Sequence, residues 1–216
     1  MQDFLEKFLS QVRETSLLEF IAVVTGIASV FFSKKENILV YPVGLINTII
    51  YVYISIKGSL FGEASVNFYY TVMSIYGWIL WARKDRQHHI LLHITNSSFK
   101  QWMQHLLFFA FFYVAIFFAL TWAKSAFYAN TIPALDAFAS ATAFTGMWLM
   151  AKKKVESWYW WIATNVTSIP LYYIKGYALT SVYYVVLLVL AVFGLMEWQQ
   201  RAKDVNQSSR FESESQ

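Results

Sequence analysis

Long apolar stretches separated by short polar connections dominate the chain. Each stretch is long enough for a membrane-spanning helix of about 20 residues. Seven are expected, at residues 16–32, 38–56, 60–81, 105–123, 132–150, 157–174 and 177–198. The pattern therefore predicts an all-α membrane protein with seven transmembrane helices.

The two ends of the chain follow other patterns. In residues 1–15, apolar side chains recur at helical spacing among charged ones. This is typical of an amphipathic helix that lies on the membrane surface and is too polar to span it. Residues 201–216 are polar and rich in serine, and we expect them to form a disordered tail.

Composition agrees with a membrane protein and excludes other classes. Hydrophobic residues make up 57% of the chain and charged residues 14%, whereas the surface of a soluble domain must be charged. Cysteine is absent, which excludes disulfides and thiolate chemistry. The net charge of +4 comes from connections between apolar stretches, so we expect no nucleic-acid partner.

Basic residues are concentrated in alternate connections. The positive-inside rule places these connections in the cytoplasm, so the N-terminus is expected outside and the C-terminus inside. The basic residues on this side are Lys34, Lys35, Arg83, Lys84, Arg86, Lys100, Lys152, Lys153, Lys154, Arg201, Lys203 and Arg210.

Sliding the chain on itself by about 118 residues aligns two basic turns, two mid-helix asparagines and two Lys-Gly turns. A one-residue slip also aligns a Gly and a Trp near the end of each half. The aligned positions are Lys34-Lys35 with Lys152-Lys153, Asn47 with Asn165, Lys57-Gly58 with Lys175-Gly176, Gly77 with Gly194, and Trp81 with Trp198. The chain therefore contains an internal repeat, and the fourth apolar stretch lies between its two copies.

Three helices are an odd number, so one inserted helix is needed to give both copies the same orientation. We predict two parallel three-helix bundles, over residues 16–81 and 131–200, joined by a cytoplasmic loop and connector helix over 82–130. Such a 3+1+3 arrangement places a substrate between the halves. Asn47 and Asn165 would then face each other across the axis.

The sixth stretch carries the densest aromatic and polar pattern. Trp158, Trp161 and Asn165 lie at i, i+3 and i+7 and share one helix face. Asn165 is near mid-bilayer, where an amide must face protein, a cavity or a ligand. Geometry alone leaves two interpretations open: an interfacial tryptophan belt with a helix-bridging asparagine, or a wall of a substrate site.

Other polar groups in the predicted spans narrow the class of function. Carboxylates such as Glu63 lie near helix ends and none is at mid-depth, which favours uncoupled transport over ion coupling. Tyr70 and Tyr184 belong to a large set of tyrosines within the spans. Clustered rings can stack on a flat solute or surround a cation, which predicts a flat aromatic, partly polar small molecule as substrate.

The competing class is a membrane protein that does not transport, either a structural partner or an intramembrane enzyme. An enzyme needs a nucleophile or a metal cluster at depth. His88, His89 and His93 lie in a basic loop that a solvated segment explains better than a metal site. We therefore expect no catalytic residue, metal or cofactor.

Trp158-x-x-Trp161-x-x-x-Asn165 resembles the helix-six signature of the PnuC family of vitamin transporters. Asn67-Phe68-Tyr69-Tyr70, followed by Tyr76-Gly77-Trp78-x-x-Trp81, is similar to the same family. The resemblance spans about residues 16–202 and includes the 3+1+3 plan shared with SWEET sugar transporters. Members carry nicotinamide riboside, thiamine or riboflavin by facilitated diffusion, and a cytoplasmic kinase then traps the vitamin.

The resemblance implies a multi-pass transporter of the bacterial cytoplasmic (inner) membrane, with the vitamin, the lipid bilayer and functionally a kinase as its partners. It implies that Trp158 and Trp161 flank the substrate ring. Asn67 stands where nicotinamide riboside carriers commonly have glutamine, so thiamine stays an alternative and riboflavin a weaker one. The oligomeric state is left open. The candidate substrate-binding residues are Trp158, Trp161, Asn165, Asn47, Asn67, Glu63, Tyr70, Thr164 and Tyr184.

Overall fold

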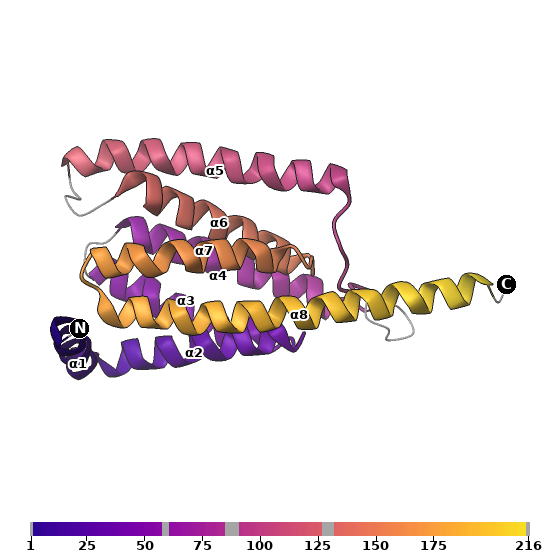
Figure 1. Ribbon diagram of the computed structural model, residues 1–216, viewed down its shortest axis with the longest axis horizontal. Helices are drawn as coiled ribbons and strands as arrows, with labels where there is room; N and C mark the ends of the chain where they lie inside the picture. The colour runs from indigo at the N-terminus through magenta and orange to yellow at the C-terminus, as the bar shows by residue number, and fades with distance from the viewer. Residues whose placement is uncertain (1, 58–60, 85–90, 127–131, 215–216) are drawn as a thin grey trace.

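The computed structural model describes residues 2–57, 61–84, 91–126 and 132–214, and its regular structure is helical apart from one isolated bridge (Figure 1). By length and composition, α2, α3, α5 and α8 could each cross a membrane. The described helices are α1 (Gln2–Glu14), α2 (Leu17–Lys34), α3 (Val40–Lys57), α4 (Phe61–Ala82), α5 (Phe99–Ala126), α6 (Pro133–Ala151), α7 (Ser157–Ile174) and α8 (Ala178–Glu214).

Local sequence explains where several helices begin. Ser16 caps α2 in a capping box, in which its hydroxyl accepts from the backbone N–H of Glu19 and the Glu19 carboxylate accepts from the backbone N–H of Ser16. Pro133 opens α6, where a missing N–H costs nothing. α5 begins at Phe99, six residues before the predicted start, because Ser98 and Gln101 cap it reciprocally: the Gln101 side chain accepts from the backbone N–H of Ser98, and the Ser98 hydroxyl accepts from that of Gln101.

The expectation of a disordered C-terminal tail is wrong for residues 201–214. α8 continues without interruption to Glu214 and projects beyond the bundle (Figure 1). The segment lacks Gly and Pro, and Arg201 is held by Glu197 on the same helix and by Glu36 on the α2–α3 turn, each at 2.9 Å. The polar composition predicted disorder. The apolar helix nevertheless continues through these polar residues, because no Gly or Pro ends it.

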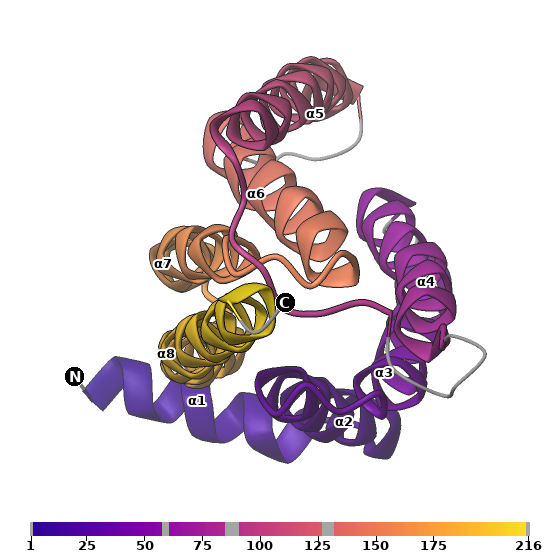
Figure 2. The same ribbon diagram turned by 90° about the vertical axis from the view of Figure 1, so that its right-hand side faces the viewer.

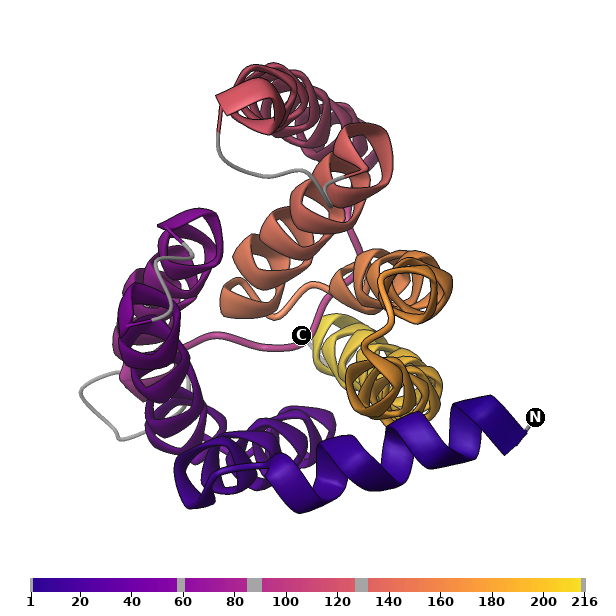
Figure 3. The same ribbon diagram turned by 90° about the vertical axis from the view of Figure 1, so that its left-hand side faces the viewer.

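Six helices form a closed ring. Within the first half α2 packs on α3 and α3 on α4; within the second, α6 packs on α7 and α7 on α8. The halves meet where α2 packs on α8 and where α4 packs on α6, and Figures 2 and 3 show this ring from its two ends. The repeat relates α2 to α6 and α4 to α8, so it also relates the α2–α8 junction to the α4–α6 junction. This agrees with the predicted 3+1+3 plan.

Both junctions rely on close approach of one helix to a neighbour. At α2–α8, a Cβ added to Gly26 would lie 2.4 Å from the hydroxyl oxygen of Tyr183, so only glycine fits. At α4–α6, the ring of Tyr69 stacks on Phe144 at 4.1 Å between centroids, and its hydroxyl donates to the carbonyl oxygen of Phe144. These contacts join the halves at opposite sides of the ring.

The remaining two helices lie outside the ring. α5 packs mainly on α6, with Phe108 stacked on Trp148 at 4.6 Å, and its Phe109 ring lies 5.1 Å from Trp160 on α7. It exposes large apolar side chains such as Leu107 and Phe111. α1 lies across the ends of α2 and α8 (Figures 2 and 3), where the Gln11 amide bonds both the Gly176 carbonyl and the Leu179 N–H. Exposed apolar surface of this extent suits a lipid environment.

Candidate functional site

The ring has two ends of different character. The basic end holds the α2–α3 turn, the α6–α7 turn and the loop before α5; the α1 end holds α1 and the α7–α8 turn. The hydrophobic core of buried residues is concentrated at the basic end. The two ends therefore differ in how tightly they are packed.

An aromatic quartet closes the basic end. Tyr41 meets Trp81 edge-on at 5.2 Å, Trp158 meets Trp198 edge-on at 5.6 Å, and Trp81 lies 6.1 Å from Trp198. Trp81 and Trp198 occupy equivalent positions of the repeat, and Tyr41 and Trp158 pack against the equivalent glycines Gly77 and Gly194. The row of rings therefore runs from one half of the ring to the other.

Hydrogen bonds and charges reinforce the same closure. The indole N–H of Trp81 donates to Ala151 in the second half, and that of Trp198 donates to Ser33 in the first. Lys153, which is 2% exposed, pairs with Glu36 at 2.7 Å across the halves and lies over the Trp81 ring. Each half thus satisfies the last carbonyls of a helix in the other.

A segment of the loop before α5 crosses the basic end. Thr95 pairs with Lys153 and Val155 through backbone hydrogen bonds, and Ile94 is buried in the core. The Glu156 carboxylate accepts from the backbone and hydroxyl of Ser97, both at 2.7 Å. Burial lowers the pKa of Lys154, while the nearby Glu156 carboxylate acts in the opposite direction. This segment adds a second layer over the quartet.

Deeper in the ring, one face of α7 points toward the first half. The ring of Trp161 lies 6.3 Å from that of Tyr70 on α4 and packs over Gly146 on α6. Asn165, one turn further along, is 3% exposed, and no hydrogen bond of its side chain occurs within the described residues. The described residues supply no hydrogen-bond partner for this amide, which leaves it available to a ligand.

Tyrosines from both halves gather next to this face, toward the α1 end. The Tyr184 ring meets that of Tyr183 edge-on at 5.7 Å between centroids, and the hydroxyl groups of Tyr51, Tyr70 and Tyr172 lie near that of Tyr184. The Tyr184 ring stacks on Tyr172 at 5.2 Å. All five are only partly buried, so these rings retain accessible surface. Trp161, Asn165, Tyr70 and Tyr184 of the predicted site therefore lie in one region.

Tyr51, Tyr172 and Tyr183 were missing from the predicted site. Tyr172 is seven residues after Asn165, so helical spacing places both on one face. That spacing was the available signal for Tyr172. For Tyr51 and Tyr183 the sequence shows only that they lie within apolar stretches. Tyr53 and Tyr173, next to them in sequence, are more than half exposed and point elsewhere.

Three other predicted site residues are engaged in packing. Trp158 is 1% exposed and belongs to the quartet, and a Cβ added to Gly194 would lie 2.5 Å from its ring. The Asn47 amide donates to the carbonyl of Ala22 on α2 at 2.6 Å, and no contact between Asn47 and Asn165 is present among the described residues. The Thr164 hydroxyl bonds that of Thr142 at 2.9 Å and joins α7 to α6.

The two remaining candidates lie on α4. The Asn67 amide donates to the Glu63 carbonyl oxygen one turn earlier, at 3.0 Å. Glu63 is exposed at the α1 end and interacts electrostatically with Tyr172 and Tyr184 of the other half. Both side chains therefore lie on the part of α4 that leads toward Tyr70.

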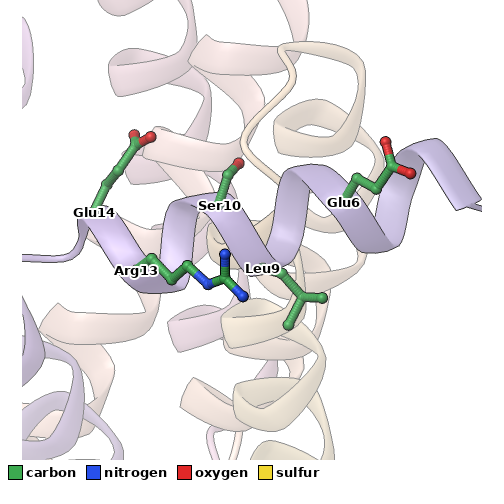
Figure 4. Close-up of a pocket in the computed structure, with 5 residues that line it drawn as sticks. All are labelled: Glu6, Leu9, Ser10, Arg13 and Glu14. Atoms are coloured by element: carbon green, nitrogen blue, oxygen red, sulfur yellow. The ribbon is translucent and has the colours of Figure 1, made fainter.

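Surface features elsewhere do not resemble a buried site. A shallow pocket on α1, lined by Glu6, Leu9, Ser10, Arg13 and Glu14, lies outside the ring (Figure 4). No group of three or more acidic or histidine ligands able to hold a metal is found among the described residues. His88 and His89 of the basic loop lie outside the described residues.

A family model described as nicotinamide mononucleotide transporter matches residues 16–200. The chain belongs to this family. Together with the apolar helices, membership makes the chain an integral membrane transporter and not an enzyme, and the expected resemblance is confirmed. The match covers the whole six-helix ring and α5, and it leaves out α1 and the end of α8.

Curated relatives point the same way. The chain is 23% identical over 211 residues to the nicotinamide riboside transporter PnuC of Escherichia coli, covering 88% of both chains. It is 28% identical to PnuC of Neisseria mucosa, over 87% of this chain and 74% of that one. A riboflavin/roseoflavin transporter, RibM of Streptomyces davaonensis, is 21% identical and covers 83% of each chain.

A solved structure confirms the fold. The crystal structure of the vitamin B3 transporter PnuC superimposes with a TM-score of 0.72 and 23% sequence identity, over 94% of this chain and 89% of that one. At this identity the match establishes the architecture of the helices. It does not establish which side chains of this chain contact a substrate.

Proposed function

We propose that this transporter takes up nicotinamide riboside. The observation that carries the proposal is the pairing of Trp161 and Tyr70 across the ring beside an Asn165 amide that has no bonding partner within the described structure. Two aromatic rings offer faces for a flat heteroaromatic ring, and an amide can bond a carboxamide or a ribose hydroxyl. The names of the PnuC relatives support this cargo.

Transport by facilitated diffusion with alternating access is the mechanism we propose. Each half is continuous internally, and its helices pack on those of the other half mainly along two junctions, α2–α8 and α4–α6, so the halves can rock as units around a site between them. Glu63 and Asp136 lie close to the α1 end of their helices, and no carboxylate lies beside Asn165 in the described residues, which supports uncoupled movement. Phosphorylation in the cytoplasm would then trap the vitamin and maintain the gradient.

The basic end is proposed to face the cytoplasm, with α1 outside. In this orientation the quartet and the segment over it close the cytoplasmic exit, and the tyrosines lie on the outer side of Asn165. The positive-inside rule supports it. Charge-selective labelling of single cysteines placed in the α2–α3 turn and on α1 would test the orientation, since the chain has no cysteine of its own.

Calorimetric titration of the purified protein tests the cargo. Saturable binding of nicotinamide riboside, followed by its uptake into proteoliposomes without an ion gradient, is expected. Riboflavin is the second candidate because RibM is a relative, and thiamine is the third because its ring is also a cationic heteroaromatic. Binding of either one in place of nicotinamide riboside, by a protein that is folded, would refute the assignment.

A further inference from the structure

Most charged groups at the α1 end are engaged in the scaffold. Asp136 on α6 pairs with Lys175 at 2.5 Å and accepts from the backbone of Ile132. Glu19 lies in the first turn of α2, as Asp136 does in that of α6; it takes part in the capping box with Ser16, and it shares a pocket lining with Lys57, the repeat equivalent of Lys175. The repeat therefore carries one acid and one lysine in each half.

Glu63 does not belong to this scheme. The equivalent position in the second half is Thr180, which is uncharged. Within the described residues Glu63 forms no ion pair, and the lysine with which it interacts electrostatically, Lys175, is already bonded to Asp136. It is therefore an additional carboxylate, present in one half only.

The surroundings of Glu63 show that it faces the inside of the ring. It precedes Tyr70 by seven residues, so both lie on one face of α4, and Tyr70 faces Trp161 of the other half at 6.3 Å between ring centroids. The hydroxyl groups of Tyr51, Tyr172 and Tyr184 lie in the same part of the ring. Glu63 is also exposed, so a solute at the α1 end can reach it.

The same face of α4 continues inward. Glu63, Asn67 and Tyr70 lie at i, i+4 and i+7, which places them in a line along one side of the helix. Tyr70 ends this line at Trp161, next to Asn165. A solute that enters from the α1 end therefore passes Glu63 before it reaches the aromatic pair.

We propose that Glu63 selects substrates that carry a positive charge. This inference rests on the proposed function and refines it: the substrate class is a cationic heteroaromatic nucleoside, such as one with a pyridinium ring, and its uncharged counterpart binds less well. An unpaired carboxylate beside tyrosine rings attracts a cation more strongly than it would in bulk water. A purely structural Glu63, stabilising the first turn of α4 through the helix dipole, would not distinguish the two forms.

The test compares binding of nicotinamide riboside with that of its reduced, uncharged dihydro form to the full-length protein. We expect Glu63→Gln to weaken binding of the cation by about tenfold and to change binding of the neutral form by less than about twofold. Glu63→Asp should keep the preference. The matched control, Glu14→Gln, removes a carboxylate from α1 at the same end but outside the ring (Figure 4), and should leave both affinities unchanged.

The outcomes separate this inference from the proposed function. If the wild-type protein binds nicotinamide riboside and Glu63→Gln keeps the same cation preference, or loses affinity equally for both forms, the role of Glu63 is overturned and the proposed cargo stands. Failure of the wild-type protein to bind either form refutes the proposed cargo and the inference with it. If Glu63→Gln does not fold, the double variant Glu63→Gln with Asn67→Asp returns the charge one turn deeper. Cation preference in that variant supports the proposal, and its absence overturns it.

Discussion

The indole rings of Trp81 and Trp198 lie 6.1 Å apart, and each donates a hydrogen bond to a helix end in the opposite half. The two residues occupy equivalent positions of the repeat. The closure of the basic end is therefore reciprocal: each half holds the other with the same side chain.

Trp81→Phe and Trp198→Phe keep a ring but remove the indole N–H. Each should weaken the closed state by about 1 kcal/mol, a roughly fivefold shift toward opening. The measurement uses a Ser33→Cys substitution, because Ser33 is buried at the basic end. A membrane-impermeant maleimide added from that side should label this cysteine faster when the end opens. Trp160→Phe is the matched control, because its indole N–H has no hydrogen-bond partner. Equal labelling of all three variants would contradict the closure.

Gly77→Ala and Gly194→Ala test how closely the quartet rings pack against α4 and α8. The added Cβ would lie 2.4 Å from the Tyr41 ring in one case and 2.5 Å from the Trp158 ring in the other. Overpacking of this kind costs about 1–3 kcal/mol, and the two variants should lose similar stability because the sites are equivalent. Thermal unfolding in detergent measures this. Wild-type unfolding temperatures in both variants would show that the Tyr41 and Trp158 rings do not pack tightly on these glycines.

Trp158→Leu and Trp161→Leu should behave differently although both tryptophans belong to one sequence signature. Trp158 is fully packed, so its truncation should cost about 3 kcal/mol or more of stability. Trp161 is partly buried and faces Tyr70, so its truncation should reduce vitamin binding at least tenfold, by loss of about 1.4 kcal/mol or more. Unfolding and titration on the same preparations separate the effects. Stable Trp158→Leu protein without binding would assign Trp158 to the substrate wall.

Asn165→Leu and Asn47→Leu form a second matched pair. Asn165 has no protein partner among the described residues, so its replacement should abolish or strongly weaken uptake at little cost in stability. Asn47 bonds the Ala22 carbonyl, which also accepts from the Thr25 hydroxyl, so the loss of Asn47 should lower stability by about 1 kcal/mol, the net contribution of one hydrogen bond. Vesicle uptake, with insertion checked by membrane fractionation, distinguishes the two. Normal uptake by Asn165→Leu would make this face a packing feature.

The order of the helices and the pairing of the halves could be predicted from the sequence. Apolar length defines the spans, and the repeat defines which helices are equivalent, because basic turns, Lys-Gly turns and the Trp81 and Trp198 positions recur at nearly constant offset. Trp161 and Asn165 were also identified correctly as neighbours on one face. These features depend on local periodicity, which sequence reports directly.

The partner of each side chain could not be predicted in the same way. Periodicity places Trp158 and Trp161 on one face but does not show that Gly194 of α8 meets the first of them. The repeat makes Asn47 equivalent to Asn165, yet Gly26 lets α2 approach closely enough for the Asn47 amide to bond the Ala22 carbonyl. Such differences arise from the distance between helices, which depends on residues far away in the chain.

The length of α8 has a mechanical consequence. Trp198 lies in the quartet, and at 1.5 Å per residue the helix continues for about 24 Å beyond it. A rotation of the second half by about 10° would therefore displace the tip by roughly 4 Å, more than any side chain within the ring would move. Under the proposed rocking of the halves, the projecting end of the helix would act as a lever, and a spectroscopic label near Gln207 would follow each transport cycle from outside the membrane.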